Sequence, residues 1–383
     1  MNTTDKKNHI ALDLIAIISI VFIAYMLQDF FIPLLFAIIL SVLIYPIVHY
    51  FESRLCFNRI VSITIAIIIF TSLVFAVFVL IGSQFEEIIS KSDKYYAQIE
   101  QKISSVLSQT EKSTGINSKD ILGSDDLKIK EIAKQNSTNI LDFLATSGSI
   151  LGDFILSPLY MFFFLLYRNF LVSFIYKVTA GAFSKAKMNI ILKELYKVQQ
   201  NYLAGLITVM ALVGILNSMG LLLLGIEHPF FFGFLAALLL LIPYIGIIIG
   251  SLLPALIAFA TKDSYWYAVG VIGIFGFIQF LEGNFITPKI TGSKVSLNAF
   301  VSILSLILFS MLWGIPGMIL ALPITASLKV IFDNSEKMKP IGILLGEAKE
   351  KYFNNKAKNR LKIWKKIRLQ NHLKIVTMLC LAF

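Results

Sequence analysis

The feature that most constrains the fold is an uncharged stretch from Phe230 to Ala260, whose length exceeds one straight crossing of a bilayer. A helix rises about 1.5 Å per residue and the hydrocarbon layer is about 30 Å thick. Comparable apolar runs cover residues 10–27, 30–51, 60–81, 150–167, 203–224, 265–281 and 300–328. Since only helices and closed barrels span membranes, these runs predict an all-α polytopic membrane protein. We expect about eight transmembrane helices, some of them broken or re-entrant.

The rest of the chain supports this class and divides it into four parts. Only 15% of the residues are charged, against about a quarter in soluble domains, and the mean hydropathy is +0.79. Residues 1–82 hold the first three predicted helices, of which the first two are predicted to form a hairpin around Gln28-Asp29. Residues 83–149 are polar with an apolar stripe at helical spacing, which predicts a small extramembrane helical insert. We expect this stripe to pack against its own hairpin or a neighbouring subunit. Residues 150–332 form the transmembrane core and 333–383 a tail.

The tail is strongly basic. From Asn334 onward there are twelve Lys and Arg residues against three Glu, a net of +9 within a whole-chain charge of +11. Such a segment after the last membrane helix predicts a cytoplasmic tail attracted to anionic lipid. Nucleic-acid binding is not expected, because no recognisable fold or aromatic platform accompanies the charge.

The distribution of basic residues also predicts a topology. With the N-terminus inside, eight crossings place Arg54, Arg59, the segment 168–200 and Lys262 in the cytoplasm with the tail. The insert, Glu227-His228 and the loop from Lys289 to Lys294 then fall outside.

Enzymatic motifs are missing from the sequence. It contains no HExxH, GxSxG, Walker or GxGxxG pattern, its four histidines are scattered, and its two cysteines are far apart. We therefore expect no catalytic site, no metal site and no cofactor. Any transport would draw on ion or solute gradients, or on another subunit, because no ATP site is present.

Polar residues and helix breakers coincide in the least polar half of the chain. The stretch from Gln279 to Asn298 places Gln279, Glu282, Asn284, Thr287 and Lys289 at the end of one apolar run, with Gly283 and Pro288 among them. A carboxylate at membrane depth usually faces a bundle interior or a water-filled path. A plain extramembrane loop remains open at this point, since short loops are also rich in Gly, Pro and Lys.

Two further apolar runs carry breakers in their centres. The segment IPYIGIIIG, residues 242–250, contains Pro243, Tyr244, Gly246 and Gly250, and residues 312–328 contain Gly314, Pro316, Gly317 and Pro323. Proline removes a backbone donor, so both helices are predicted to kink or unwind there. Transporters often build their sites from such discontinuous helices, although a packing kink in a tilted helix is the alternative.

These three segments together resemble the signature segments of the autoinducer-2 exporter (AI-2E) family, bacterial inner-membrane permeases. The resemblance covers roughly residues 10–345 and departs at Ile247, where the family commonly has proline, and at Asn298-Ala299. It implies multi-helix transport, with export of autoinducer-2 or exchange of Na⁺ or Li⁺ for H⁺ as the proposed activities, and plausible homo-oligomers.

We therefore hypothesise a secondary transporter for a small polar solute, with Glu282 as the ion- or proton-responsive carboxylate, polarised by Lys289 or by desolvation. Gln279 and Asn284 would supply hydrogen bonds, and the glycine and proline breaks would be hinges. Cation/proton exchange is the alternative within the family. A non-transporting membrane scaffold, working through its insert and tail, is the alternative of another class.

Overall fold

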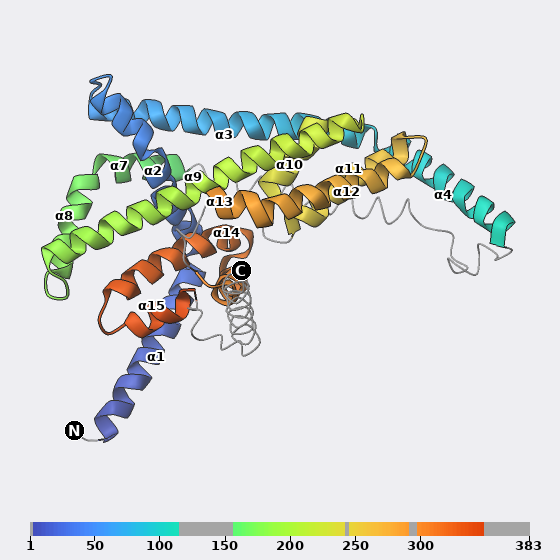
Figure 1. Ribbon diagram of the computed structural model, residues 1–383. Coiled ribbons are helices and arrows are strands. Elements are labelled where there is room, and N and C mark those ends of the chain that lie inside the picture. Colours follow the sequence, from blue (N-terminus) through green and yellow to red (C-terminus); the bar gives the residue numbers. More distant parts are fainter. Residues whose placement is uncertain (1–2, 115–155, 242–244, 291–296, 348–383) are drawn as a thin grey trace, which may run out of the picture.

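The computed structural model describes residues 3–114, 156–241, 245–290 and 297–347 of the chain. Within these ranges the protein is all-α, and the only β-type pairing is an isolated bridge between Leu297 and Gly346. Five helices are long and apolar enough to cross a membrane, or six if one pair bent by 71° counts as a span. The protein is thus an all-α polytopic membrane protein (Figure 1), but the predicted count of eight crossings is not confirmed.

Five crossing candidates among the described residues are single long runs by length and composition. They are α2 (Gln28–Ser53), α3 (Arg59–Ser90), α9 (Lys185–Leu223), α14 (Ala299–Asn334) and the run from α12 (Trp266–Leu281) through η1 (Glu282–Ile286) to α13 (Thr287–Ile290). The bent pair consists of α7 (Leu156–Leu166) and α8 (Arg168–Thr179).

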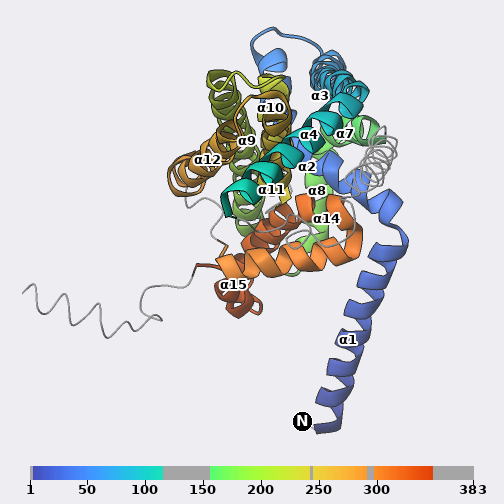
Figure 2. The same cartoon turned by 90° about the vertical axis from the view of Figure 1, so that its right-hand side faces the viewer.

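The first two helices do not form the predicted hairpin. Helix α1 (Thr3–Met26) is separated from α2 by Leu27 alone. Leu27 N donates to Ile23 O at 2.9 Å, and Phe31 N donates to Leu27 O at 2.9 Å. Because these i to i−4 bonds carry the helical pattern through the junction, the chain bends there without reversing. Figures 1 and 2 both show α1 projecting away from the other helices.

The long uncharged run is a re-entrant pair and not one crossing. It forms α10 (Pro229–Leu239) and α11 (Ile245–Thr261), which pack against each other. A Cβ placed on Gly225, before α10, would lie 3.3 Å from the ammonium nitrogen of Lys262, after α11. The chain therefore enters and returns at the same end of the bundle, and the prediction that Lys262 lies opposite Glu227 is wrong.

The insert packs against this re-entrant pair. Helix α4 (Ser92–Thr114) contacts α11, and Lys102 Nζ donates to the carbonyl oxygen of Phe259 at 2.8 Å and to that of Lys262. The buried Tyr95 donates its hydroxyl to Glu227 at 2.8 Å. Burial, followed by the hydrogen bond to Glu227, raises the pKa of Tyr95 to about 12. The described part of the amphipathic stripe thus packs against this chain's own core, at the end that carries Glu227 and Lys262.

Helix α14 folds sharply near its middle. If straight, its 36 residues would span about 54 Å. Asn298 N, just before α14, nevertheless donates to Leu345 O at 3.0 Å, at the end of the short α15 (Lys339–Leu345) that follows α14. The bend lies at Trp313 and Gly314, where Gly314 has φ 61° and ψ −137°. This region is open mainly to glycine, so the residue type explains the place of the bend.

The central helix is α9, which packs against α2, α10, α12 and α14. The basic segment 168–200 and the helix 203–224 were predicted to be separate, but α9 runs unbroken for 39 residues from an N-cap at Ser184. At about 58 Å it is longer than the hydrocarbon layer, so it extends beyond the membrane.

The basic ends of several helices meet at one end of the bundle. Arg168 pairs with Glu52 at 2.7 Å, and Arg59 Nη2 donates to Leu165 O at 2.8 Å. Asn334 at the end of α14 donates to Glu194 of α9 at 2.8 Å. This joint location agrees with the predicted common side for Arg54, Arg59 and the segment 168–200.

Candidate functional site

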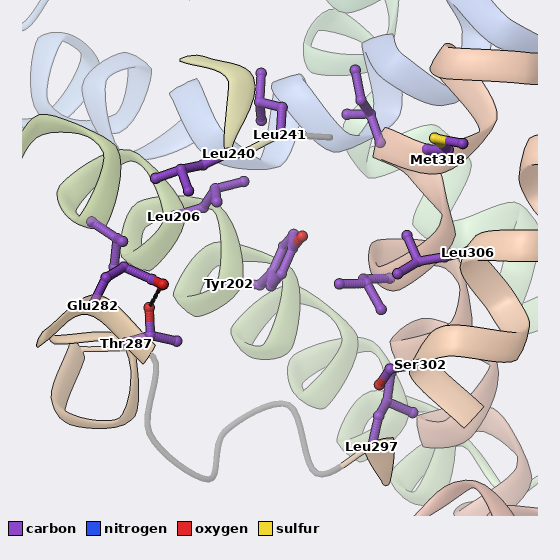
Figure 3. A pocket seen from close by; sticks show the side chains of 13 residues that line it. Tyr202, Leu206, Leu240, Leu241, Glu282, Thr287, Leu297, Ser302, Leu306 and Met318 are labelled. Atoms are coloured by element: carbon purple, nitrogen blue, oxygen red, sulfur yellow. Dashed lines mark hydrogen bonds between the residues drawn. The ribbon is translucent and has the colours of Figure 1, made fainter. Parts of the chain in front are cut away.

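A cavity of about 300 Å³ lies where the discontinuous helices meet α9. Its wall combines α9, the residues that follow α10, the η1–α13 segment and both halves of the bent α14 (Figure 3). The lining residues are Tyr202, Leu206, Val209, Leu240, Leu241, Glu282, Thr287, Leu297, Ser302, Leu306, Met318, Ile319 and Leu322. Most are aliphatic, as in many small-molecule sites, with a few polar groups that can orient a ligand.

The acidic group of this cavity sits in a π-helical turn. The sequence predicted a break around Gly283, and the structure has the wide turn η1, Glu282–Ile286, between α12 and α13. Such π-turns inside α-helices are rare and occur frequently at functional sites. Here the turn places Thr287 beside Glu282, although five positions separate them in the sequence.

The Glu282 carboxylate is held by two neutral donors. Gln279 Nε2 donates to Glu282 Oε2 at 2.6 Å. Thr287 Oγ1 donates to Glu282 Oε1, the bond that Figure 3 shows as a dashed line. Neutral donors fix the position of a carboxylate without cancelling its charge. No ion pair joins Glu282 to Lys289 in the described part of the chain, and polarisation of Glu282 by Lys289 or by desolvation stays a prediction.

The structure therefore brings three of the predicted site residues into one hydrogen-bonded group: Gln279, Glu282 and Thr287. The group does not include Asn284 or Lys289. Asn284 is exposed, and its side-chain amide donates to Phe280 O of its own helix at 2.9 Å. Lys289 is also exposed, on the short α13. Whether these residues act in transport stays a prediction.

Two polar lining residues, Tyr202 and Ser302, were not predicted from the sequence. Tyr202 of α9 points into the cavity between the Glu282 side and α14, and Ser302 lies on the opposite wall (Figure 3). Ser302 Oγ donates to Asn298 O at 3.0 Å, which holds the hydroxyl oxygen near the start of α14. Their sequence signal is weak, because isolated Tyr and Ser residues are common in membrane helices and only the fold brings them to Glu282.

The predicted hinge residues have different surroundings. Pro243 and Tyr244 lie outside the described residues. Gly246 and Gly250 are buried within α11, where they allow close packing against the α10 residues Leu239 and Ala236. A larger side chain at either glycine would collide with α10, so their role in the structure is close packing.

The other predicted hinge residues lie at the π-turn and in α14. Gly283 and Pro288 are exposed on η1 and α13. Gly314 forms the bend of α14, Pro316 follows it, and Gly317 packs against the carbonyl oxygen of Phe309 across the bend. Pro323 lies further along α14, and its carbonyl oxygen accepts from Gln199 Nε2 of α9 at 2.6 Å. Hinge motion at these positions stays a prediction.

The sequence of this chain matches a known family. A family model described as AI-2E family transporter matches residues 14–337, which is most of the chain. The chain belongs to the AI-2E transporter family. As a family member it is a membrane transporter or permease. Among the described residues, no three His, Cys, Asp or Glu side chains gather as metal ligands would.

Individual relatives support the same class. A protein of Escherichia coli (strain K12) named "Putative transport protein YhhT" is 24% identical over 348 residues, covering 90% of this chain and 95% of the relative. YrrI of Bacillus subtilis (strain 168), described in the same words, is 34% identical over 139 residues, 36% of this chain and 39% of YrrI. The E. coli protein named AI-2 transport protein TqsA is 29% identical over 124 residues, 32% of this chain and 36% of TqsA.

Proposed function

We propose that this AI-2E transporter is a secondary permease that binds a small polar solute in the cavity beside Glu282. The observation that carries the proposal is the position of this carboxylate. It lines a cavity of about 300 Å³ and is fixed by Gln279 and Thr287, with its charge uncompensated by a base in the lining. Intramembrane carboxylates are costly and usually mark a substrate or ion path.

The chemistry of the wall favours a solute with several hydroxyl groups. Glu282 offers acceptor oxygens, and the hydroxyl of Tyr202 can donate or accept. The hydroxyls of Thr287 and Ser302 already donate to Glu282 and to Asn298 O, and their oxygens can still accept. The aliphatic remainder of the wall would contact a short carbon skeleton. The relative TqsA is named for autoinducer-2 transport, and a molecule of that class is the first solute to test.

The arrangement also offers a route for alternating access. The cavity contacts both halves of α14 and the residues at the end of α10. A shift of either broken segment would change the opening of the cavity while Glu282 stays on the α12–α13 run. Transporters of several folds move discontinuous helices around a central site in this way.

Exchange of Na⁺ or Li⁺ for protons is the second candidate. It is favoured by the charge of the cavity lining, which includes one acid and no Lys, Arg or His. A carboxylate in that setting can alternate between binding a cation and binding a proton.

Everted vesicles expressing the full chain test both candidates. We expect labelled autoinducer-2 to accumulate, and Glu282→Gln to reduce uptake by about tenfold or more and to flatten its pH dependence. Glu86→Gln is the matched control, because Glu86 is exposed on α3 and far from the cavity lining. Normal uptake by Glu282→Gln would remove this carboxylate from the path. Cation-dependent proton movement without solute uptake would favour the exchanger.

The orientation, location and assembly are also proposals. We place the protein in the bacterial inner membrane, with the basic end around Arg59 and Arg168 and the basic tail in the cytoplasm. The cytoplasmic N-terminus was predicted from the distribution of basic residues over eight crossings, and it stays a prediction because that count is not confirmed. Contacts with membrane lipids and a homo-oligomeric state stay predictions.

A further inference from the structure

A second polar site lies behind the cavity, at the end of the re-entrant helix α10. It is a void of about 10 Å³ between α9, α10, α11 and α12, and Asn217 and Gln279 supply its polar side chains. A space of this size holds one water-sized particle. None of the residues that line it carries a charge.

Asn217 supplies a buried, unpartnered acceptor to this void. Its side chain is 3% exposed, and its Oδ1 atom has no hydrogen-bond partner in the described structure. A buried acceptor without a partner costs about 1–3 kcal/mol in general, so natural proteins usually retain one only where water or an ion satisfies it. The neighbouring Ser218 differs, because its hydroxyl donates to Gly214 O at 2.7 Å.

The backbone adds acceptor character at the same place. The last carbonyl groups of a helix lack intrahelical partners, and that end carries a partial negative charge. Leu240 N donates to Ala237 O at 3.2 Å and Leu241 N to Leu238 O at 3.1 Å, a tighter pattern than the α-helical one. The tighter turn draws Leu240 N–H away from the carbonyl oxygen of Ala236, a residue that lines the void.

Gln279 connects this void to the cavity. It lines the void, and its amide nitrogen donates to Glu282 Oε2 at 2.6 Å. Glu282 engages one of the two N–H groups of this amide, and the amide oxygen of Gln279 remains available as an acceptor. Three features favour a positive occupant over a neutral one: the amide oxygens of Asn217 and Gln279, the negative end of the α10 dipole, and the Glu282 carboxylate that is hydrogen-bonded to Gln279.

We propose that Asn217, Gln279 and the carbonyl end of α10 bind a dehydrated monovalent cation no larger than water, such as Na⁺ or Li⁺. This cation site is separate from the solute cavity and is linked to it by the Gln279–Glu282 hydrogen bond. Within the proposed transport function it is the coupling-ion site, since cation binding would stabilise the charged form of Glu282 through Gln279. Binding itself does not require that function.

Thermal stability of the purified full-length protein tests the site without measuring transport. The protein is prepared free of Na⁺ and heated in increasing NaCl or LiCl, with choline chloride as the ionic-strength control because choline exceeds the void. A bound ligand raises the melting temperature with its concentration. We expect a rise in NaCl or LiCl and none in choline chloride.

Variants locate the binding. Asn217→Leu keeps the size of the side chain but removes the oxygen, and it should weaken the apparent Na⁺ affinity by about tenfold or more. Ser218→Ala is the matched control, a buried polar neighbour whose hydroxyl is already satisfied, and should keep the response. Asn217→Asp keeps the oxygen, should keep or tighten Na⁺ binding, and decides the matter if Asn217→Leu does not fold.

Two results would overturn the proposal. Equal melting temperatures in NaCl, LiCl and choline chloride would mean that the void holds only water. An undiminished Na⁺ response in Asn217→Leu, or a lost response in the folded Asn217→Asp, would place the ion elsewhere. A Na⁺-specific shift without any solute uptake in vesicles would instead refute the proposed solute transport and leave the cation site standing.

Discussion

The bend of α14 allows a clean test of how a single glycine shapes the transport site. Gly314 adopts φ 61° and ψ −137°, and a Cβ added there would meet no atom within 4 Å. Any cost of Gly314→Ala therefore comes from the backbone and not from a steric clash. Holding an L-residue in such a conformation costs about 1–3 kcal/mol.

The matched control is Gly276→Ala in α12. This glycine is exposed, and an added Cβ would also meet nothing within 4 Å, but it lies inside a regular helix. Alanine is favoured over glycine in a helix by about 0.5–1 kcal/mol. The two substitutions add the same methyl group to the same protein and should move its stability in opposite directions.

The assay is the loss of monodisperse protein on heating in detergent, followed by size-exclusion chromatography. Since 1–2 kcal/mol corresponds to a factor of about 5–30 in the folded to unfolded ratio, Gly314→Ala should lower the midpoint clearly while Gly276→Ala should not. Solute uptake should fall as well, because residues on both sides of the bend line the cavity. Equal midpoints for the two variants would refute the argument that the bend depends on the left-handed backbone of Gly314.

Two further predictions concern the insert and the topology. Tyr95→Phe removes the hydrogen bond to Glu227 but keeps the packing. It should speed amide hydrogen exchange in α4. Tyr96→Phe is the control, because the described structure shows no hydrogen bond from the Tyr96 hydroxyl. Unchanged exchange would show that apolar contact alone docks the insert. Replacing Cys380 by serine leaves Cys56, an exposed thiol at the basic end, as the one cysteine in the sequence. Cys56 should then react with a membrane-impermeant maleimide in everted vesicles but not in intact cells. Labelling in intact cells would reverse the proposed orientation.

Part of the site could be predicted because its members are neighbours in the sequence. Gln279, Glu282 and Thr287 lie within about two and a half helical turns, so any helical path keeps them close. Helix geometry could not predict that a π-turn would aim Thr287 at Glu282 in place of Lys289. The side chains that complete the surroundings, Tyr202 and Asn217, come from a helix more than sixty residues away.

The predicted helices show the same division. Each predicted apolar run in the described ranges is helical, since a backbone in lipid must satisfy its own hydrogen bonds. The direction after each break was harder to predict. Leu27 continues a helix where a hairpin was expected, and α10 and α11 pack as a pair that returns to the same end where a crossing was expected. Apolarity is equal for a segment that crosses and for one that enters and returns.

The sequence by itself determined that this chain is a helical membrane protein with a polar insert, a basic end and one carboxylate among helix breakers. These properties follow from local composition, because the cost of placing polar and charged groups in hydrocarbon acts on each segment separately. Only the tertiary structure decided which broken helices return, what covers the insert and which oxygens surround Glu282 and Asn217. Those features depend on contacts between segments far apart in the chain, and the close approach of α9, α10, α12 and α14 supplies them.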